Sequence, residues 1–206
     1  MQVCGKRILY MKKLTLLLGV TFLTCTTIFA QLSPRLFIKA GVNLADLKLE
    51  NVDNSATDMR VGFHGGLGAH FHLAPEWALQ PEILYSQEGA EVGNEKAKLD
   101  FINIPLMLQY MFNNGFRLEA GPQFGFMINS KRELANGNEV DIDNLYKTPN
   151  VGLGFGLNYL SYSGLGIGAR YNLGLSNIHE FEDVRTRTLQ FSLFYMFDAR
   201  HKAKSR

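Results

Sequence analysis

The stretch Val61 to Leu73, "VGFHGGLGAHFHL", holds three of the chain's five histidines and decides how the fold is interpreted. Side chains in a β-strand point to opposite faces with a period of two. One parity of this segment is apolar: Val61, Phe63, Leu67, Phe71 and Leu73. The other parity carries His64, His70 and His72 among glycines. The function of the histidines therefore depends on which face is the inside of the protein.

The same alternation recurs along the chain, in eight runs bounded by turn residues. We expect strands over Leu36 to Leu44, Arg60 to Leu73, Trp77 to Glu88, Phe101 to Phe112, Phe116 to Ile128, Asn150 to Tyr159, Leu165 to Leu175 and Thr188 to Phe197. One face of each strand is free of charge. The other carries all the charges within the strands, namely Lys39, Arg60, Glu82, Glu88, Arg117, Glu119 and Arg170.

The connections between these strands alternate in length. The turns "APE", "NNG" and "LSYSG" are short, whereas the polar connections span Ala45 to Met59, Gly89 to Asp100, Asn129 to Pro149 and Ser176 to Arg187. Short turns at one end and long polar loops at the other are typical of outer-membrane barrels. The sequence predicts an all-β fold, an eight-stranded antiparallel up-and-down transmembrane β-barrel.

A soluble, lipocalin-like barrel with the faces reversed is the main alternative fold. It would expose the glycine-rich face to water, yet that face lacks the density of charge that soluble surfaces carry. Lysine or arginine at the lipid face costs about 2 to 4 kcal/mol at the midplane, which explains the absence of charge from the apolar face. The polarity of the two strand faces therefore favours a membrane barrel over a soluble one.

The N-terminal segment has the pattern of a secretory signal peptide over residues 1–30, with Met11 as the expected start and cleavage between Ala30 and Gln31. It carries four of the 21 Lys and Arg residues and no acid, which leaves 17 against 19 acids. Both cysteines, Cys4 and Cys25, are also removed. A mature chain with no excess of basic residues is not expected to bind a nucleic acid. We expect a barrel over 31–197 and a basic periplasmic tail over 198–206.

Five stretches give the chain a family resemblance: "IKAGVNLADL", "WALQPEILYSQEGA", "FINIPLMLQYMF", "FRLEAGPQFGFMI" and "LQFSLFYMF". They resemble the small outer-membrane β-barrel proteins, often labelled porin-family, of Bacteroidetes-type bacteria. The resemblance covers essentially the whole mature chain and implies an eight-stranded barrel in the outer membrane. It carries no catalytic motif, and the residues after Phe197 depart from its usual aromatic end.

Three side chains are weak candidates for a metal site. His70 and His72 share a face, and Glu82 on the next strand could join them on zinc or copper. The alternative, which we favour, is that they are polar lumen fillers. We expect no cofactor.

The lumen charges suggest a network that plugs the barrel, formed by Lys39, Glu82, Arg117, Glu119 and Arg170. The alternative is a narrow ion path gated by those pairs, although eight strands leave little room for one. A lipid-modifying enzyme of the outer leaflet would need a nucleophile and a base facing lipid, whereas His64 and Ser86 face inward. We therefore predict a structural or surface-interaction role and no enzyme activity.

The sequence also predicts contacts with lipid and with other proteins of the cell envelope. Aromatic side chains suited to the membrane interfaces are Trp77, Tyr85, Tyr159, Tyr171, Tyr195 and Phe197. The expected partners are outer-membrane lipid, the barrel-insertion machinery through the C-terminal strand, and an extracellular partner at the long loops. The longest loop, Asn129 to Pro149, is where such a partner is expected to bind.

Overall fold

A computed structural model describes residues 33–49, 58–92, 95–135, 138–141, 149–177 and 184–197. The predicted signal peptide and the basic tail lie outside these residues. The strands are β1 (Arg35–Leu49), β2 (Asp58–His72), β3 (Trp77–Val92), β4 (Glu95–Met111), β5 (Phe116–Glu133), β6 (Glu139–Asp141), β7 (Asn150–Leu160), β8 (Leu165–Gly174) and β9 (Val184–Met196). No helix in the described part is long and apolar enough to cross a membrane.

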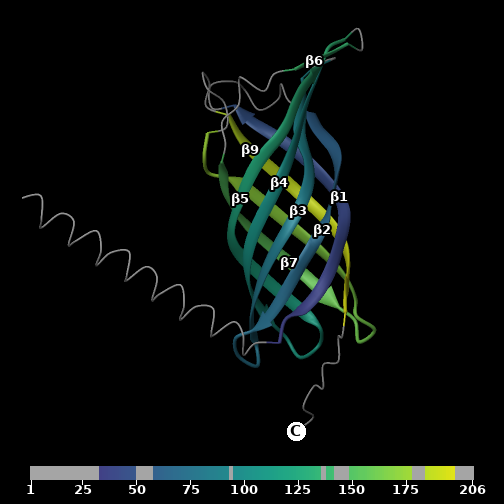
Figure 1. Ribbon diagram of the computed structural model, residues 1–206, viewed down its shortest axis with the longest axis vertical. Helices are drawn as coiled ribbons and strands as arrows, with labels where there is room; N and C mark the ends of the chain where they lie inside the picture. The colour runs from purple at the N-terminus through teal and green to yellow at the C-terminus, as the bar shows by residue number, and fades with distance from the viewer. Residues whose placement is uncertain are drawn as a thin grey trace, which may run out of the picture. The chain divides into compact units, whose positions relative to one another are not determined.

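The sheet closes on itself as an antiparallel barrel (Figure 1). Its order is β4-β3-β2-β1-β9-β8-β7-β5, and an additional β4–β5 pairing joins the two ends. The short strand β6 pairs with β5 at the long-loop end and does not enter the barrel wall. The barrel therefore has eight strands, as the alternation predicts.

Three tight turns define the opposite, short-turn end, at residues 73–76, 112–115 and 161–164. Gly115 and Gly164 have φ angles of 92° and 88° there. Such left-handed backbone is open to glycine and costly for most other residues, which fixes the two turns.

Two long connections are not as predicted. Gly89 to Asp100 was expected to be a loop, but β3 runs on to Val92 and β4 starts at Glu95, with Ala90 opposite Ala97. Within Asn129 to Pro149, β5 continues to Glu133 and pairs with β6. Polar composition misled the prediction, because ladder hydrogen bonds and cross-strand ion pairs stabilise these hairpins, and the first hairpin also buries Ala90 and Leu99.

The apolar face points outward on the barrel strands. Phe63 and Leu67 on β2, Ile83 on β3 and Leu193 on β9 each have at least 60% of their surface exposed. The inward face differs from the prediction, because apolar clusters lie at both ends of the lumen beside the polar residues. An upper plug at the long-loop end consists of Leu47, Ala90, Leu99, Phe101 and Val184. A lower plug at the short-turn end consists of Phe37, Leu160, Phe194 and Met196.

Candidate functional site

The middle of the lumen holds four charged side chains, here called the ion cluster: Lys39, Glu82, Glu119 and Arg170. Arg170 donates from Nη2 and Nη1 to the two oxygens of Glu82, at 2.8 and 2.9 Å, and from Nε to Glu119 at 2.6 Å. Lys39 Nζ donates to Glu82 at 2.7 Å. A charge taken out of water is costly unless it is paired and hydrogen-bonded. The ion cluster meets both conditions, because its charges are paired with opposite charges through hydrogen bonds.

These four residues come from β1, β3, β5 and β8, far apart in sequence. The sequence proposed Lys39, Glu82, Arg117, Glu119 and Arg170 as one network. The structure brings four of the five into direct contact and places Arg117, second residue of β5, nearer the short-turn end.

A second group lies between the ion cluster and the upper plug. It is formed by amide, hydroxyl, imidazole and carboxyl side chains, and we call it the amide–hydroxyl cluster: Asn43, His64, Ser86, Glu88, Asn103, Thr188, Gln190 and Ser192. Glu88 accepts hydrogen bonds from Ser86, Asn103 and Thr188. Sequence reasoning missed the extent of this group, because its members lie on five strands and meet only through the closure of the barrel.

His64 joins two members of this cluster. Its Nδ1 lies 2.7 Å from Asn43 Oδ1, and its Nε2 lies 2.8 Å from Ser192 Oγ. Serine hydrolases activate their nucleophile with a similar arrangement, in which a serine hydroxyl contacts an imidazole that a third group orients. Here Asn43 and His64 are at most 3% exposed and lie between the two plugs. The partner of His64 is Ser192 and not Ser86, the candidate that the sequence suggested.

The three weak metal candidates, His70, His72 and Glu82, are engaged in other contacts. Among the described residues, no group of three His, Cys, Asp or Glu side chains is arranged to hold an ion. His70 and His72 are in edge-to-face contact, with ring centroids 4.7 Å apart. Glu82 instead belongs to the ion cluster, where Arg170 and Lys39 occupy its oxygens.

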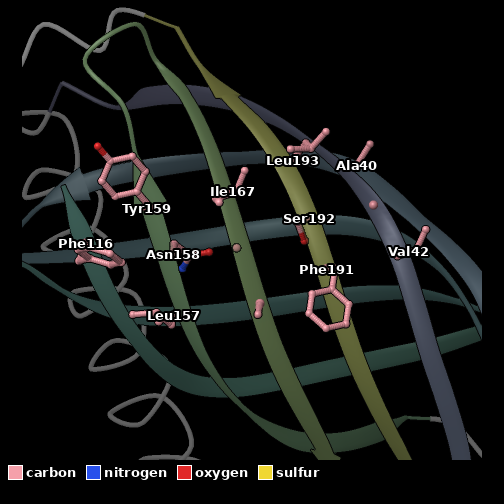
Figure 2. A pocket seen from close by; sticks show the side chains of 13 residues that line it. Ala40, Val42, Phe116, Leu157, Asn158, Tyr159, Ile167, Phe191, Ser192 and Leu193 are labelled. Carbon is pink, nitrogen blue, oxygen red and sulfur yellow. The ribbon is translucent and has the colours of Figure 1, made fainter.

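The outer wall carries a shallow hollow of about 540 Å³ over β5, β7, β8, β9 and β1 (Figure 2). Figure 2 shows Phe116 and Tyr159 on one side of it and Ala40 and Val42 on the other. Its lining is almost wholly apolar. The hollow therefore suits a hydrocarbon environment, although Asn158 and Ser192 also border it.

The predicted interface aromatics all lie on or near the outer wall. Trp77, Tyr159, Tyr195 and Phe197 are at the short-turn end, where Trp77 stacks edge-on with Tyr110 at 5.1 Å and Tyr195 with Phe197 at 5.4 Å. Tyr85 and Tyr171 are also exposed but lie further along β3 and β8. Tyrosine and tryptophan favour the headgroup level of a membrane, so the first group suits an interface girdle.

The long-loop end projects beyond the apolar band as a charged ribbon built from the ends of β3, β4, β5 and β6. Lys98 contacts Glu133 at 2.6 Å and Glu139 at 2.8 Å, and Lys131 contacts Glu139 at 3.1 Å. Lys96 contacts Glu91 at 3.0 Å. Because lysines and glutamates of neighbouring strands pair in these contacts, the ion pairs add to the backbone ladder in stabilising the ribbon.

These contacts predict an acid-sensitive ribbon. Hydrogen bonds from Lys98 and then Lys131 hold the pKa of Glu139 below its ordinary value, and bonds to Glu133 and Glu139 raise the pKa of Lys98. Since the pKa of Glu139 is lowered on folding, its contribution is present above the ordinary glutamate pKa and is lost as pH falls through the folded value.

An NMR titration of the Glu139 carboxyl carbon should therefore show a midpoint below about 4.3, the ordinary glutamate value. The double variant Lys98→Gln, Lys131→Gln should return the midpoint to that value. A wild-type midpoint at or above the ordinary value would contradict the ribbon contacts.

Taken together, an eight-stranded barrel with an apolar outer wall, short turns at one end and extended hairpins at the other defines the class of outer-membrane β-barrel proteins. The chain belongs to the outer membrane protein beta-barrel domain family, whose sequence pattern matches residues 29–180. Its localisation is accordingly the outer membrane. The family match carries no information on the bacterial group, so the Bacteroidetes-type origin stays a prediction.

The chain is similar to several solved outer-membrane proteins, and the first of those named here supports the fold. Neisserial surface protein A aligns with a TM-score of 0.53 and 13% identity, over 79% of this chain and 97% of that one. Ail of Yersinia pestis, in complex with the heparin analogue sucrose octasulfate, aligns with a TM-score of 0.49 and 16% identity, over 80% and 99%. OprG from Pseudomonas aeruginosa aligns with a TM-score of 0.40 and 14% identity, over 81% of this chain and 97% of that one. No curated protein matches the sequence.

Proposed function

We propose that this protein is a non-conducting outer-membrane barrel that holds its charged ribbon at the cell surface for a structural or adhesive contact. The observation that carries the proposal is the filling of the lumen at every level. The lower plug, the ion cluster, the amide–hydroxyl cluster and the upper plug follow one another along the barrel axis. Eight strands enclose an interior just wide enough for side chains to fill.

A narrow channel is the alternative that the sequence left open. Ions would have to displace Phe101 in the upper plug and Phe37 in the lower one, both at most 1% exposed. They would also have to separate Arg170 from Glu82 and Glu119, which lie within 2.9 Å of it. Both steps act against passage, so the packing supports a closed barrel.

Planar-bilayer recordings test this proposal directly. Refolded wild-type protein, with folding verified by a heat-dependent gel shift, should give no reproducible conductance steps. The control is a quadruple variant that opens both plugs: Phe37→Ser, Leu99→Ser, Phe101→Ser, Phe194→Ser. Its recordings show whether the method can detect a leak through the barrel. Reproducible steps from wild type at the same protein density would exclude the closed barrel and favour the channel.

The surface role rests on the ribbon. Rigid scaffolds display binding groups on the segments between their strands, and here Val140 on β6 is 47% exposed among Lys98, Lys131 and Glu139. No catalytic role is included in the proposal, because His64 and Asn43 are buried in the packed lumen between the plugs.

A further inference from the structure

The hollow in the outer wall lies where the ladder places a small side chain between two large ones. Ala169 on β8 pairs with Leu157 on β7 and with Phe191 on β9, and all three line the hollow. Ala169 is half-buried, whereas Leu157 and Phe191 are 47% and 44% exposed. The methyl group of Ala169 therefore forms part of the floor, and the two larger side chains rise beside it.

The depression continues along the wall toward β2. Ala40 on β1 lies in the ladder between Leu193 on β9 and Gly65 on β2. A Cβ atom added to Gly65 would meet nothing closer than a backbone oxygen at 3.6 Å and the Cβ of Ala40 at 4.0 Å. The wall beside Ala40 is therefore also low, and the hollow crosses several strands (Figure 2).

The two polar residues that border the hollow turn their side chains away from it. Asn158 and Ser192 belong to the lumen-facing parity of β7 and β9. Ser192 Oγ lies 2.8 Å from Nε2 of His64 inside the barrel, and Asn158 is 4% exposed. The surface that the hollow offers to its surroundings is apolar, so the ligand that fits it is a hydrocarbon.

One end of the hollow carries aromatic side chains and a hydroxyl group. Phe116 begins β5 and Tyr159 lies next to the end of β7, with ring centroids 5.2 Å apart at the short-turn end. Figure 2 shows the Tyr159 hydroxyl pointing away from Leu157. No hydrogen bond within the described part of the chain occupies this hydroxyl. Because tyrosine favours the headgroup level of a membrane, the hydroxyl is placed to meet a polar group of a lipid.

The position of the hollow in the membrane-facing wall indicates what fills it. An acyl chain is flexible and can bend into a depression, where it touches the floor and both sides and gains dispersion contacts. A second copy of the barrel would present another convex wall, whereas stable protein interfaces bury about 800 Å² per partner. The volume of about 540 Å³ lies within the range of about 300 to 1,000 Å³ for small-molecule sites. These arguments favour a lipid chain over a second copy.

We propose that the hollow binds one acyl chain of a glycerophospholipid whose polar part lies at Tyr159. The chain lies over Ala169 and Ala40, between the larger side chains. The Tyr159 hydroxyl donates a hydrogen bond to an ester or phosphate oxygen of the lipid. In outer-membrane barrels the short turns face the periplasm, so the lipid belongs to the periplasmic leaflet.

Native mass spectrometry of the full-length folded protein in a neutral detergent, titrated with phosphatidylethanolamine, tests the proposal. Wild type should retain one lipid molecule, and the lipid should raise Tm saturably, because a ligand that binds only the folded state stabilises it. Ala169→Trp should weaken binding by roughly tenfold or more, the loss expected when two or more methylene groups are displaced. Tyr159→Phe should weaken it roughly three- to tenfold, as expected for one hydrogen bond.

Ala120→Trp is the matched control for the filled hollow. Ala120 lies on the outward face of β5 between Leu108 and Phe155 but does not line the hollow. This change should leave the binding of phosphatidylethanolamine unchanged. A heat-dependent gel shift verifies the folding of each variant, and Ala40→Phe fills the hollow from another strand if Ala169→Trp does not fold.

Unchanged binding in the filled variant, or an equal loss in Ala120→Trp, would overturn the proposal. A dimer that Ala169→Trp converts to a monomer would assign the hollow to a second copy and overturn the lipid site. Tighter binding of lipopolysaccharide than of phosphatidylethanolamine would overturn the assignment to the periplasmic leaflet. Unchanged binding in Tyr159→Phe would overturn the placement of the polar part of the lipid.

Discussion

Replacing Arg170 with methionine is expected to lower the free energy of unfolding by about 3 to 5 kcal/mol, the cost of leaving a buried ion pair with one partner removed. Arg170 makes three hydrogen bonds to Glu82 and Glu119, and its side chain is 3% exposed. Without it, two buried carboxylates share the single charge of Lys39. Urea-induced unfolding from lipid vesicles measures the difference.

The control for this prediction is Arg132→Met, because Arg132 is exposed on the ribbon. Its effect should remain within about 0.5 kcal/mol. The quadruple variant Lys39→Met, Glu82→Leu, Glu119→Leu, Arg170→Met should recover most of the lost stability, since apolar replacement of a whole buried ion group is often neutral or stabilising. A loss for Arg170→Met no larger than that for Arg132→Met would show that the ion cluster is solvated in the folded protein.

Truncating Phe37 to alanine is expected to cost about 3 to 5 kcal/mol by opening a cavity in the lower plug. The ring is 1% exposed, meets Phe194 edge-on at a centroid distance of 6.2 Å, and lies over Gly68. A Cβ atom added to Gly68 would be 2.1 Å from Cζ of Phe37, so the ring occupies the space that the glycine leaves. The same unfolding measurement applies.

Phe63→Ala is the matched control, because Phe63 lies on the adjacent strand but faces outward and is 64% exposed. It leaves no internal cavity, and its effect should be clearly smaller than that of Phe37→Ala. Gly68→Val should in turn force the ring of Phe37 from its position and destabilise the barrel by about 1 to 3 kcal/mol. Equal losses for the two phenylalanines would contradict a tightly packed lower plug.

The alternation of residues predicted much of this architecture. Val61, Phe63 and Leu67 were assigned to the outer face and His64 and His70 to the lumen from parity alone, and the structure agrees. The prediction failed at Gly89 to Asp100, where polar residues form a hairpin and not a loop. Its buried apolar residues, such as Ala90 and Leu99, are few and lie among charged ones, and its ladder and ion pairs add no apolar period to the sequence.

The sequence by itself determined the class of protein, the strand number and the side of the wall that meets lipid, because a period of two and the cost of charge in hydrocarbon are local properties of the chain. Only the tertiary structure decided which lumen residues meet. The curvature of the closed barrel brings Arg170 on β8 to Glu82 on β3, which are not neighbours in the sheet. It also pairs His64 with Ser192. Contacts across a lumen depend on register and closure, which no single strand encodes.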